Sequence, residues 1–281
     1  MDRRSLIKQA GIAGILAAGV APAVQAQTAV RWRLAASFPK SLDTIFGSGE
    51  KFAQTLKDMS GGKFEVSLHA AGELMPAFEV VNGVQNGIVD MALTAPYYFT
   101  GKDYVFAFGC AVPFGLTARQ MDAWMEHGGG RKLMDEFYAN YNIKSMSAGN
   151  TGTQMGGWYR KEIKTVADLK GLRMRVPNIP LYIEFAKNLG QSGQPMPFAE
   201  VPSALDQGTI DGGDSPFSDI VALKMYEIAP HITLSGHLLV IHSLYINNDF
   251  YNKLPPEDRK IFDEAAKRSA EDVWKMAAEG E

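Results

Sequence analysis

The sequence of 281 residues contains little cysteine and histidine and has no excess of basic charge. Its single cysteine, Cys110, excludes a disulfide scaffold and any zinc or iron–sulfur site built from several thiolates. Because Cys110 lies in the apolar run FAFGCAVPFG, we expect a buried, unreactive thiol. Lys and Arg number 28 against 31 Asp and Glu, a net charge of −3. This balance excludes the basic surface that nucleic-acid binding requires, so no nucleic-acid partner is expected.

Motifs of common enzyme classes are also missing. The sequence has no G-x-S-x-G nucleophile elbow, P-loop or G-x-G-x-x-G dinucleotide motif. His231, His237 and His242 are near one another in sequence, but their spacing fits neither one helix face nor an alternating strand, which disfavours a metal site. We therefore expect a protein that is not an enzyme. A hydrolase or lyase acting on organic acids is the alternative, and turnover assays would reveal it.

A long run of apolar residues lies near the N-terminus. Arg3, Arg4 and Lys8 precede the apolar stretch at 10–24, and the segment ends in the small-x-small pattern Val24-Gln25-Ala26. This combination is typical of an export signal peptide over residues 1–26. The paired arginines favour the twin-arginine (Tat) route, with the Sec route as the alternative. We expect a periplasmic mature protein.

The start of the predicted mature chain has the rhythm of an α/β fold. Residues 30–35 and 64–68 alternate between apolar and polar positions, which predicts two strands. Between them, residues 45–59 carry apolar side chains at helical spacing and are followed by two glycines. A strand, a helix and a second strand in this order indicate helices packed against a sheet.

Two segments that are far apart in the chain resemble each other. Residues 80–90 read VVNGVQNGIVD and residues 201–211 read VPSALDQGTID. In each, a helical pattern ends at a glycine, and an aspartate three residues later precedes a short predicted strand. Each strand runs into an X-Pro-aromatic turn, at residues 95–97 and 215–217. Since ligands collect at the carboxyl ends of strands in open α/β sheets, we expect two similar lobes that share a cleft.

Candidate ligand-binding residues lie near these predicted strand ends. Arg175 is on the polar face of a predicted strand that ends at Pro177, and its guanidinium has the geometry to hold a carboxylate by two parallel hydrogen bonds. An exposed arginine in a surface ion pair is the alternative. Gln154 lies among glycines that permit close approach of a ligand. The other candidates are the turn residues Asp214 and Ser215 and the aromatic walls Tyr97, Tyr98 and Phe217. Asp214 has the alternative role of capping the next helix.

The chain resembles the solute-binding subunits of tripartite ATP-independent periplasmic (TRAP) transporters over nearly all of its predicted mature length. The stretches that carry this resemblance are LKGLRMRVP, PMPFAEVPSALDQGTIDGGDSP, YEIAPHITLSGH and YINNDFYNKLPPEDRKIFDEAAK. The N-terminal half is most similar to the branch that binds 2-oxo acids, through TAPYYFTGKDYVFAFGCAVPFGLTARQ and AGNTGTQMGGWYRKEI.

The resemblance implies a two-lobe α/β fold of the type II periplasmic-binding-protein class, with a long C-terminal helix that braces it. We expect lobe I at 27–151 and 242–281 and lobe II at 152–241. It also implies that hinge closure buries a small organic acid, a 2-oxo or 2-hydroxy monocarboxylate, on Arg175 and Gln154. The partners implied are the ligand and the membrane permease subunits of a TRAP transporter, with the protein itself a monomer or dimer.

The resemblance further implies a Na⁺ or Ca²⁺ ion that bridges the ligand, with Asp214 and Gln154 as its candidate ligands. One departure bears on the solute. The 2-oxo-acid branch has Glu-Trp where this chain has Asp214-Ser215-Pro216, which is nearer to the Glu-Asn-Pro of dicarboxylate-type members. A receptor for C4-dicarboxylates or other carboxylates is therefore an alternative, and a ligand-sensing module for a signalling receptor is another.

Overall fold

The strands and helices expected from the sequence pattern are present. The structure, a computed structural model, describes residues 29–110, 112–177, 179–235 and 239–279, so the predicted signal peptide lies outside it. The alternating and helical patterns near the start form β1 (Val30–Ala36), α2 (Asp43–Met59) and β2 (Phe64–His69). No helix in these described ranges is both long and apolar enough to cross a membrane.

The remaining elements of the first half surround β3 and lead into one long strand. They are α3 (Val80–Gln85), β3 (Met91–Thr94), the 3₁₀ turns η1 (Pro96–Phe99) and η2 (Tyr104–Ala107), α4 (Ala118–His127), α5 (Gly130–Ala139) and β4 (Ile143–Tyr159). The glycine triplet at 128–130 separates α4 from α5, with Gly129 in the left-handed conformation at φ 84°.

The second half repeats short strands and helices before the chain returns to the first. These are η3 (Val166–Leu169), β5 (Arg173–Val176), α6 (Pro180–Asn188), β6 (Ser192–Pro195), η4 (Phe198–Glu200), α7 (Val201–Asp206), β7 (Gly212–Pro216), α8 (Phe217–Ala222), η5 (Met225–Glu227) and β8 (His231–Thr233). The return consists of β9 (Leu239–Asn247), α9 (Asn248–Lys253) and α10 (Pro256–Glu279).

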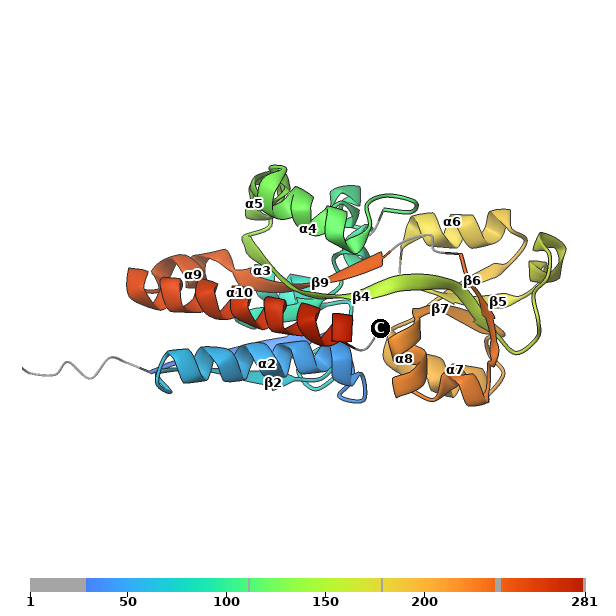
Figure 1. The fold of residues 1–281 in the computed structure, drawn as a ribbon, viewed down its shortest axis with the longest axis horizontal. Helices are drawn as coiled ribbons and strands as arrows, with labels where there is room; N and C mark the ends of the chain where they lie inside the picture. Colours follow the sequence, from blue (N-terminus) through green and yellow to red (C-terminus); the bar gives the residue numbers. More distant parts are fainter. Residues whose placement is uncertain (1–28, 111, 178, 236–238, 280–281) are drawn as a thin grey trace, which may run out of the picture.

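The strands form a sheet in the order β2-β1-β3-β9-β4-β7-β5-β6, with β8 added to β4. β2, β1 and β3 are parallel to one another, and so are β7, β5 and β6. β9 is antiparallel to both β3 and β4, and β7 is antiparallel to β4. Because β4 pairs with β9 along its first part and with β7 along its last, it belongs to both lobes and crosses between them (Figure 1).

The two lobes are built from the same unit, as the internal similarity predicted. The strand order β2-β1-β3 in one lobe matches β6-β5-β7 in the other. Gly87 and Gly208, which end the matching helical segments, both adopt left-handed φ angles, of 69° and 68°. That conformation strains any residue with a Cβ, which explains glycine at both positions.

A pair of aspartates marks the same place in each unit. Asp90 Oδ2 accepts a hydrogen bond from the backbone N–H of Arg33 at 2.7 Å, and Asp211 Oδ2 accepts one from the backbone N–H of Arg173 at 2.8 Å. Each aspartate also lies within ion-pair distance of the side chain of the same arginine. The Arg173 guanidinium thereby lowers the pKa of Asp211. Both aspartates fix the start of a parallel strand pair.

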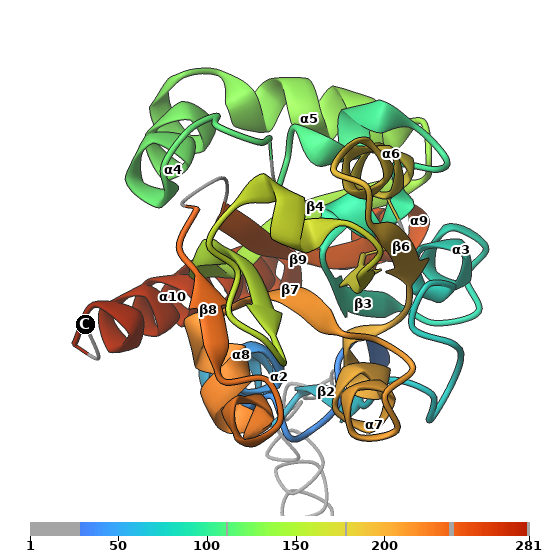
Figure 2. The same cartoon turned by 90° about the vertical axis from the view of Figure 1, so that its right-hand side faces the viewer.

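Helix α10 packs against the larger lobe. It lies beside α2 and below β4 in Figure 1, whereas α4 and α5 lie on the opposite side of β4 in both views (Figures 1 and 2). Phe262 of α10 is completely buried, and its ring contacts the rings of Trp32, Phe52, Phe64 and Tyr251. This aromatic cluster attaches the long C-terminal helix to the first sheet.

Cys110 is buried in the same lobe, as predicted. Its thiol donates to the carbonyl oxygen of Ile241 at 3.1 Å, and burial raises its pKa to about 12. The thiolate, which is the reactive form, is therefore disfavoured at neutral pH.

Candidate functional site

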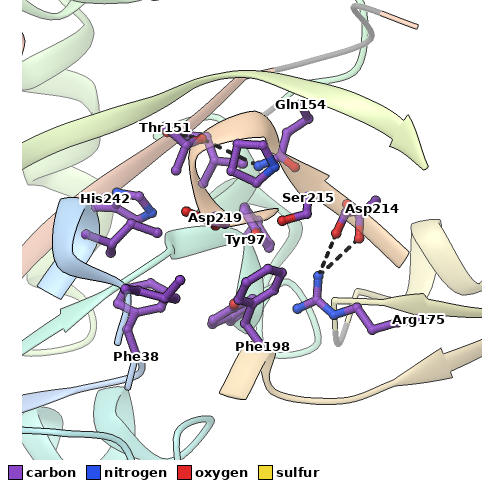
Figure 3. A pocket seen from close by; sticks show the side chains of 15 residues that line it. Phe38, Tyr97, Thr151, Gln154, Arg175, Phe198, Asp214, Ser215, Asp219 and His242 are labelled. Atoms are coloured by element: carbon purple, nitrogen blue, oxygen red, sulfur yellow. Dashed lines mark hydrogen bonds and ion pairs between the residues drawn. The ribbon is translucent and has the colours of Figure 1, made fainter. Parts of the chain in front are cut away.

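A small pocket lies where the two lobes meet (Figure 3). Its walls come from the ends of β3, β5 and β7, the middle of β4 and the start of β9. The space between its lining atoms, part of which is open to solvent, is about 290 Å³. The described residues that line it are Phe38, Leu42, Ile45, Tyr97, Tyr98, Thr151, Gln154, Arg175, Phe198, Asp214, Ser215, Pro216, Asp219, Val240 and His242.

Arg175 is buried in this pocket rather than paired on the surface, with 2% of its side chain exposed. Its Nη1 donates to Asp214 Oδ1 at 3.1 Å and to the Asp214 carbonyl oxygen at 3.4 Å, and its Nε donates to the Met196 carbonyl oxygen at 3.3 Å. The guanidinium also lies over the ring of Phe198, with Cζ 5.1 Å from the ring centre. Backbone and side-chain contacts thus hold the guanidinium in one orientation.

Two polar atoms of the pocket are buried without a hydrogen-bond partner. They are Nη2 of Arg175 and Oγ of Ser215, from the neighbouring strands β5 and β7. Buried polar groups in native proteins are nearly always paired, because an unpaired one loses its hydration without compensation. Both residues line the pocket, and hydrogen-bond donors of this kind are expected in a binding site for an anion. Since Asp214 occupies Nη1, the guanidinium offers the anion one nitrogen instead of the predicted parallel pair.

Tyr97 and Tyr98 line the pocket as predicted, with their rings edge to face at 4.9 Å. Burial raises the pKa of both hydroxyls, so they remain neutral hydrogen-bond donors. Burial by itself would lower the pKa of Arg175. The Asp214 carboxylate and, to a smaller extent, the two tyrosines raise it above its ordinary value, so the guanidinium is charged.

Several oxygen atoms face the same space. The Gln154 amide donates to Thr151 Oγ1 at 3.5 Å, and the buried carboxylates of Asp214 and Asp219 line the pocket (Figure 3). The N-cap position of α8 is Pro216 and not Asp214. Carboxylate, amide and hydroxyl oxygens are the donors that Na⁺ and Ca²⁺ prefer. No group of three or more His, Cys, Asp or Glu side chains suited to a metal occurs in the described part of the chain.

His231 and His242 lie on different strands and in different surroundings. His231 is exposed on β8, whereas His242 is buried on β9 and its ring packs edge to face on Phe38 at 5.1 Å. Burial lowers the pKa of His242 to about 3, so it is a neutral wall of the pocket. His237 lies outside the described residues, as does the side chain of Phe217, whose backbone begins α8.

The stability of the protein should fall below pH 6.5 in a way that depends on His242. The unfolded chain protonates this histidine near its ordinary pKa of about 6.5, but the native state does not until about pH 3. Between these values the unfolded state binds one more proton, which destabilises the fold by up to about 1.4 kcal/mol per pH unit. Urea denaturation of wild type and His242→Gln at pH 7.5, 6 and 5 measures this difference. The control is His231→Gln, at an exposed site, in which the free energy of unfolding should change with pH as it does in wild type. The same change with pH in His242→Gln contradicts the prediction.

Sequence patterns did not reveal several residues of this site. Phe38, Phe198, Asp219 and His242 all line the pocket, yet none belongs to a motif that marks it. Phe38, Phe198 and Asp219 follow β1, β6 and β7, and His242 lies on β9. Only the order of the strands in the sheet brings these positions together. A signal for Phe198 was available, since it follows β6 as Tyr97 follows β3, at a carboxyl strand end.

A pocket with a buried arginine between two α/β lobes is typical of a protein that encloses a small ligand. The chain matches the family of bacterial extracellular solute-binding proteins, family 7 (DctP), over residues 35–281, and belongs to it. It is therefore a solute-binding protein of the TRAP type, with the two-lobe type II fold that the sequence indicated. TRAP solute-binding proteins bind small organic acids and deliver them to membrane permease subunits.

One relative binds the class of acid that the sequence suggested. A monocarboxylate 2-oxoacid-binding periplasmic protein of Nostoc sp. is 38% identical, and the match covers 93% of this chain and 74% of the relative.

Two solved structures of TRAP periplasmic solute-binding proteins show different ligands. The protein of Pseudoalteromonas atlantica, with bound sodium and pyruvate, is 35% identical, with a TM-score of 0.81 over 89% of this chain and 76% of that one. The protein of Desulfovibrio desulfuricans, with bound sn-glycerol-3-phosphate, is 43% identical, with a TM-score of 0.78 over 89% of this chain and 80% of that one.

Proposed function

We propose that this protein binds a small 2-oxo or 2-hydroxy monocarboxylate in the pocket between its lobes. The observation that carries the proposal is that one pocket is lined by two residues with a buried, unpaired polar atom, Nη2 of Arg175 and Oγ of Ser215. Both groups can donate a hydrogen bond, and the oxygen atoms of a ligand carboxylate can accept one from each. Gln154, Tyr97 and Tyr98 are the neutral donors available for the oxygen on the second carbon atom of the ligand. Ser215 and Phe217 complete the proposed set, with Asp214 as the partner of Arg175.

The apolar part of the pocket supports a ligand with a short carbon chain. The side chains of Phe38, Leu42, Ile45 and Val240 form this apolar wall. Such a wall suits a short alkyl group, which gains roughly 0.8 kcal/mol for each buried CH₂. Larger sugar acids carry hydroxyl groups that this wall would leave without partners.

A cation is expected to accompany the ligand. Among the described lining residues, one guanidinium faces the two carboxylates of Asp214 and Asp219, and His242 is neutral. A bound monocarboxylate adds a third negative charge next to these two carboxylates, and placing like charges together is costly in a buried site. Na⁺ or Ca²⁺ offsets this charge, and Asp214 and Gln154 are its proposed ligands. Sodium accompanies pyruvate in the Pseudoalteromonas protein.

Transport is the proposed purpose of this binding. The proposed lobes, 27–151 with 242–281 and 152–241, close on the ligand because the closed form gains contacts from both sides. The closed form then docks on TRAP permease subunits. We propose a periplasmic location after export by the Tat or Sec route, and no enzymatic turnover of the ligand.

Thermal denaturation of the purified mature protein tests this function. At a hundredfold excess over Kd, pyruvate or lactate should stabilise the native state by about 2.7 kcal/mol, which raises the Tm by roughly 5–10 °C. The shift should be larger with Na⁺ or Ca²⁺ than in metal-free buffer. Lactamide, which replaces the carboxylate by a neutral amide, is the matched control and should give no shift. An unchanged Tm with every small carboxylate contradicts the proposed function.

sn-Glycerol-3-phosphate is a second candidate ligand, because the Desulfovibrio protein that binds it is 43% identical. Its phosphate carries close to two negative charges at neutral pH. A pocket with one arginine, already paired with Asp214, and a second carboxylate is poorly suited to that charge. A Tm shift with sn-glycerol-3-phosphate and none with 2-oxo or 2-hydroxy acids would favour this candidate.

A further inference from the structure

We propose that Asp214 makes the pocket selective for singly charged anions. It occupies one nitrogen of Arg175 and balances the guanidinium charge, so that donors for one carboxylate remain and no positive charge remains for a second. This inference rests on the proposed function and narrows its ligand class. The pocket would exclude dicarboxylates and phosphate monoesters because of their second negative charge and not because of their length.

The geometry around Arg175 supports a single anionic position. Nη1 makes both of its hydrogen bonds to Asp214, and Nε bonds to the Met196 carbonyl oxygen. Of the three guanidinium nitrogens, Nη2 alone has no hydrogen-bond partner, and Ser215 Oγ is a second unpaired polar atom among the lining residues. A second carboxylate on the guanidinium would have to displace Asp214 from a contact at 3.1 Å and leave that carboxylate buried beside another anion.

The charges of the pocket also favour an anion with a single charge. Arg175 is the one cationic side chain among its described lining residues, whereas Asp214 and Asp219 are two carboxylates that are 7% and 3% exposed. His242 remains neutral at any physiological pH. A dianion would bring a second negative charge close to these two carboxylates. Like charges brought together in a buried site cost several kcal/mol.

The opposite wall offers nothing to a second anionic group. Phe38, Leu42, Ile45 and Val240 are apolar and almost completely buried. The neutral donors of the pocket can bind a keto or hydroxyl oxygen, but they cannot balance a full charge. A ligand with a methyl group at its far end therefore fits where the same ligand with a carboxylate does not.

Two four-carbon acids test this selectivity directly. Malate carries a carboxylate at the position where 2-hydroxybutyrate carries a methyl group, and both are 2-hydroxy acids. In calorimetric titrations of the mature protein, wild type should bind 2-hydroxybutyrate at least about a hundredfold more tightly than malate. Asp214→Asn keeps the shape of the side chain and removes its charge, and should reduce this ratio at least about tenfold.

The control variant is Asp211→Asn. Asp211, directly before β7, pairs with Arg173 at the start of β5, and neither residue lines the pocket. Asp211→Asn removes one negative charge from the chain, as Asp214→Asn does. The ratio of the affinities for 2-hydroxybutyrate and malate should nevertheless stay at the wild-type value. Equal affinities of wild type for the two acids, or an unchanged ratio in Asp214→Asn, overturn the inference alone. Failure of pyruvate and both acids to bind overturns the proposed function as well.

A measurement on wild type covers the case in which Asp214→Asn does not fold. sn-Glycerol-3-phosphate changes from a dianion to a monoanion as the pH falls through about 6. Wild type should therefore bind it at least about tenfold more tightly at pH 5 than at pH 7.5, whereas 2-hydroxybutyrate, a monoanion at both values, should change little. Equal affinities for sn-glycerol-3-phosphate at the two pH values overturn the inference.

Discussion

Replacement of Arg175 by lysine is expected to weaken the binding of pyruvate or a 2-hydroxy acid by a large part of roughly 2–5 kcal/mol. This corresponds to a loss of about thirtyfold to a few thousandfold in affinity. Lysine retains the charge but has one donor group at the end of a flexible stem. It cannot bond at once to Asp214, to the Met196 carbonyl oxygen and to the ligand, as the three nitrogens of Arg175 can.

Calorimetric titration of Arg175→Lys with pyruvate measures the effect, and the Tm without ligand shows whether the variant is folded. Arg173→Lys is the matched control, because Arg173 lies two residues earlier on β5 but pairs with Asp211 at an exposed position. Its affinity for pyruvate should equal that of wild type. An unchanged affinity in folded Arg175→Lys would falsify the assignment of the carboxylate to this side chain.

Truncation of Phe262 to alanine is expected to give a large loss of stability, about 3–5 kcal/mol. The side chain is completely buried, and its ring contacts Trp32, Phe52, Phe64 and Tyr251 at centre distances of 5.3–5.9 Å. Its removal leaves a cavity between α10 and the first sheet that these rigid rings cannot fill by small movements. The lobe would keep its strands and lose the attachment of its long helix.

Urea denaturation followed by circular dichroism measures this loss as a change in the free energy of unfolding. Lys267→Ala is the control on the same helix, because Lys267 is exposed and alanine is a good helix former. It should change the stability by less than about 0.5 kcal/mol. A loss below about 1 kcal/mol in Phe262→Ala would show that α10 is not held by this cluster.

Local patterns were sufficient to predict the repeated unit of the fold. The glycine and aspartate shared by residues 80–90 and 201–211 correspond to left-handed turns and to hydrogen bonds with Arg33 and Arg173. Backbone conformation and strand starts depend on a few neighbouring residues, so a short stretch of sequence records them. The same reasoning placed Tyr97, Tyr98, Asp214 and Ser215 at strand ends that line one pocket.

The composition of the pocket could not be predicted in the same way. His242 is on β9 and Asp219 on α8, and they face Gln154 only because β9 and β7 flank β4. Arg175 pairs with Asp214 because β5 and β7 are adjacent in the sheet. The two residues are 39 positions apart in the sequence, so the sequence does not reveal this contact. Contacts of this kind are set by sheet order, and that order is a property of the whole chain.

The glycine-rich segment around Gln154 also differs from its local appearance. Its composition favours an irregular segment that a ligand approaches, yet it is part of the 17-residue strand β4. The pairing of β4 with β9 shifts register between Ser147 and Gly149 and again between Asn150 and Thr153. These irregularities lie next to the proposed boundary between the lobes, where a strand must bend for closure.

The central position of β9 has a consequence for biosynthesis. This strand follows every other described strand along the chain, yet it lies between β3 and β4 in the sheet. A nascent chain that has emerged as far as β8 can pair β5 with β6 and β7, but β3 and β4 still lack the strand between them. The chain must therefore leave the ribosome as far as Asn247 before the larger lobe can form, and β9 then inserts between two strands that were made earlier.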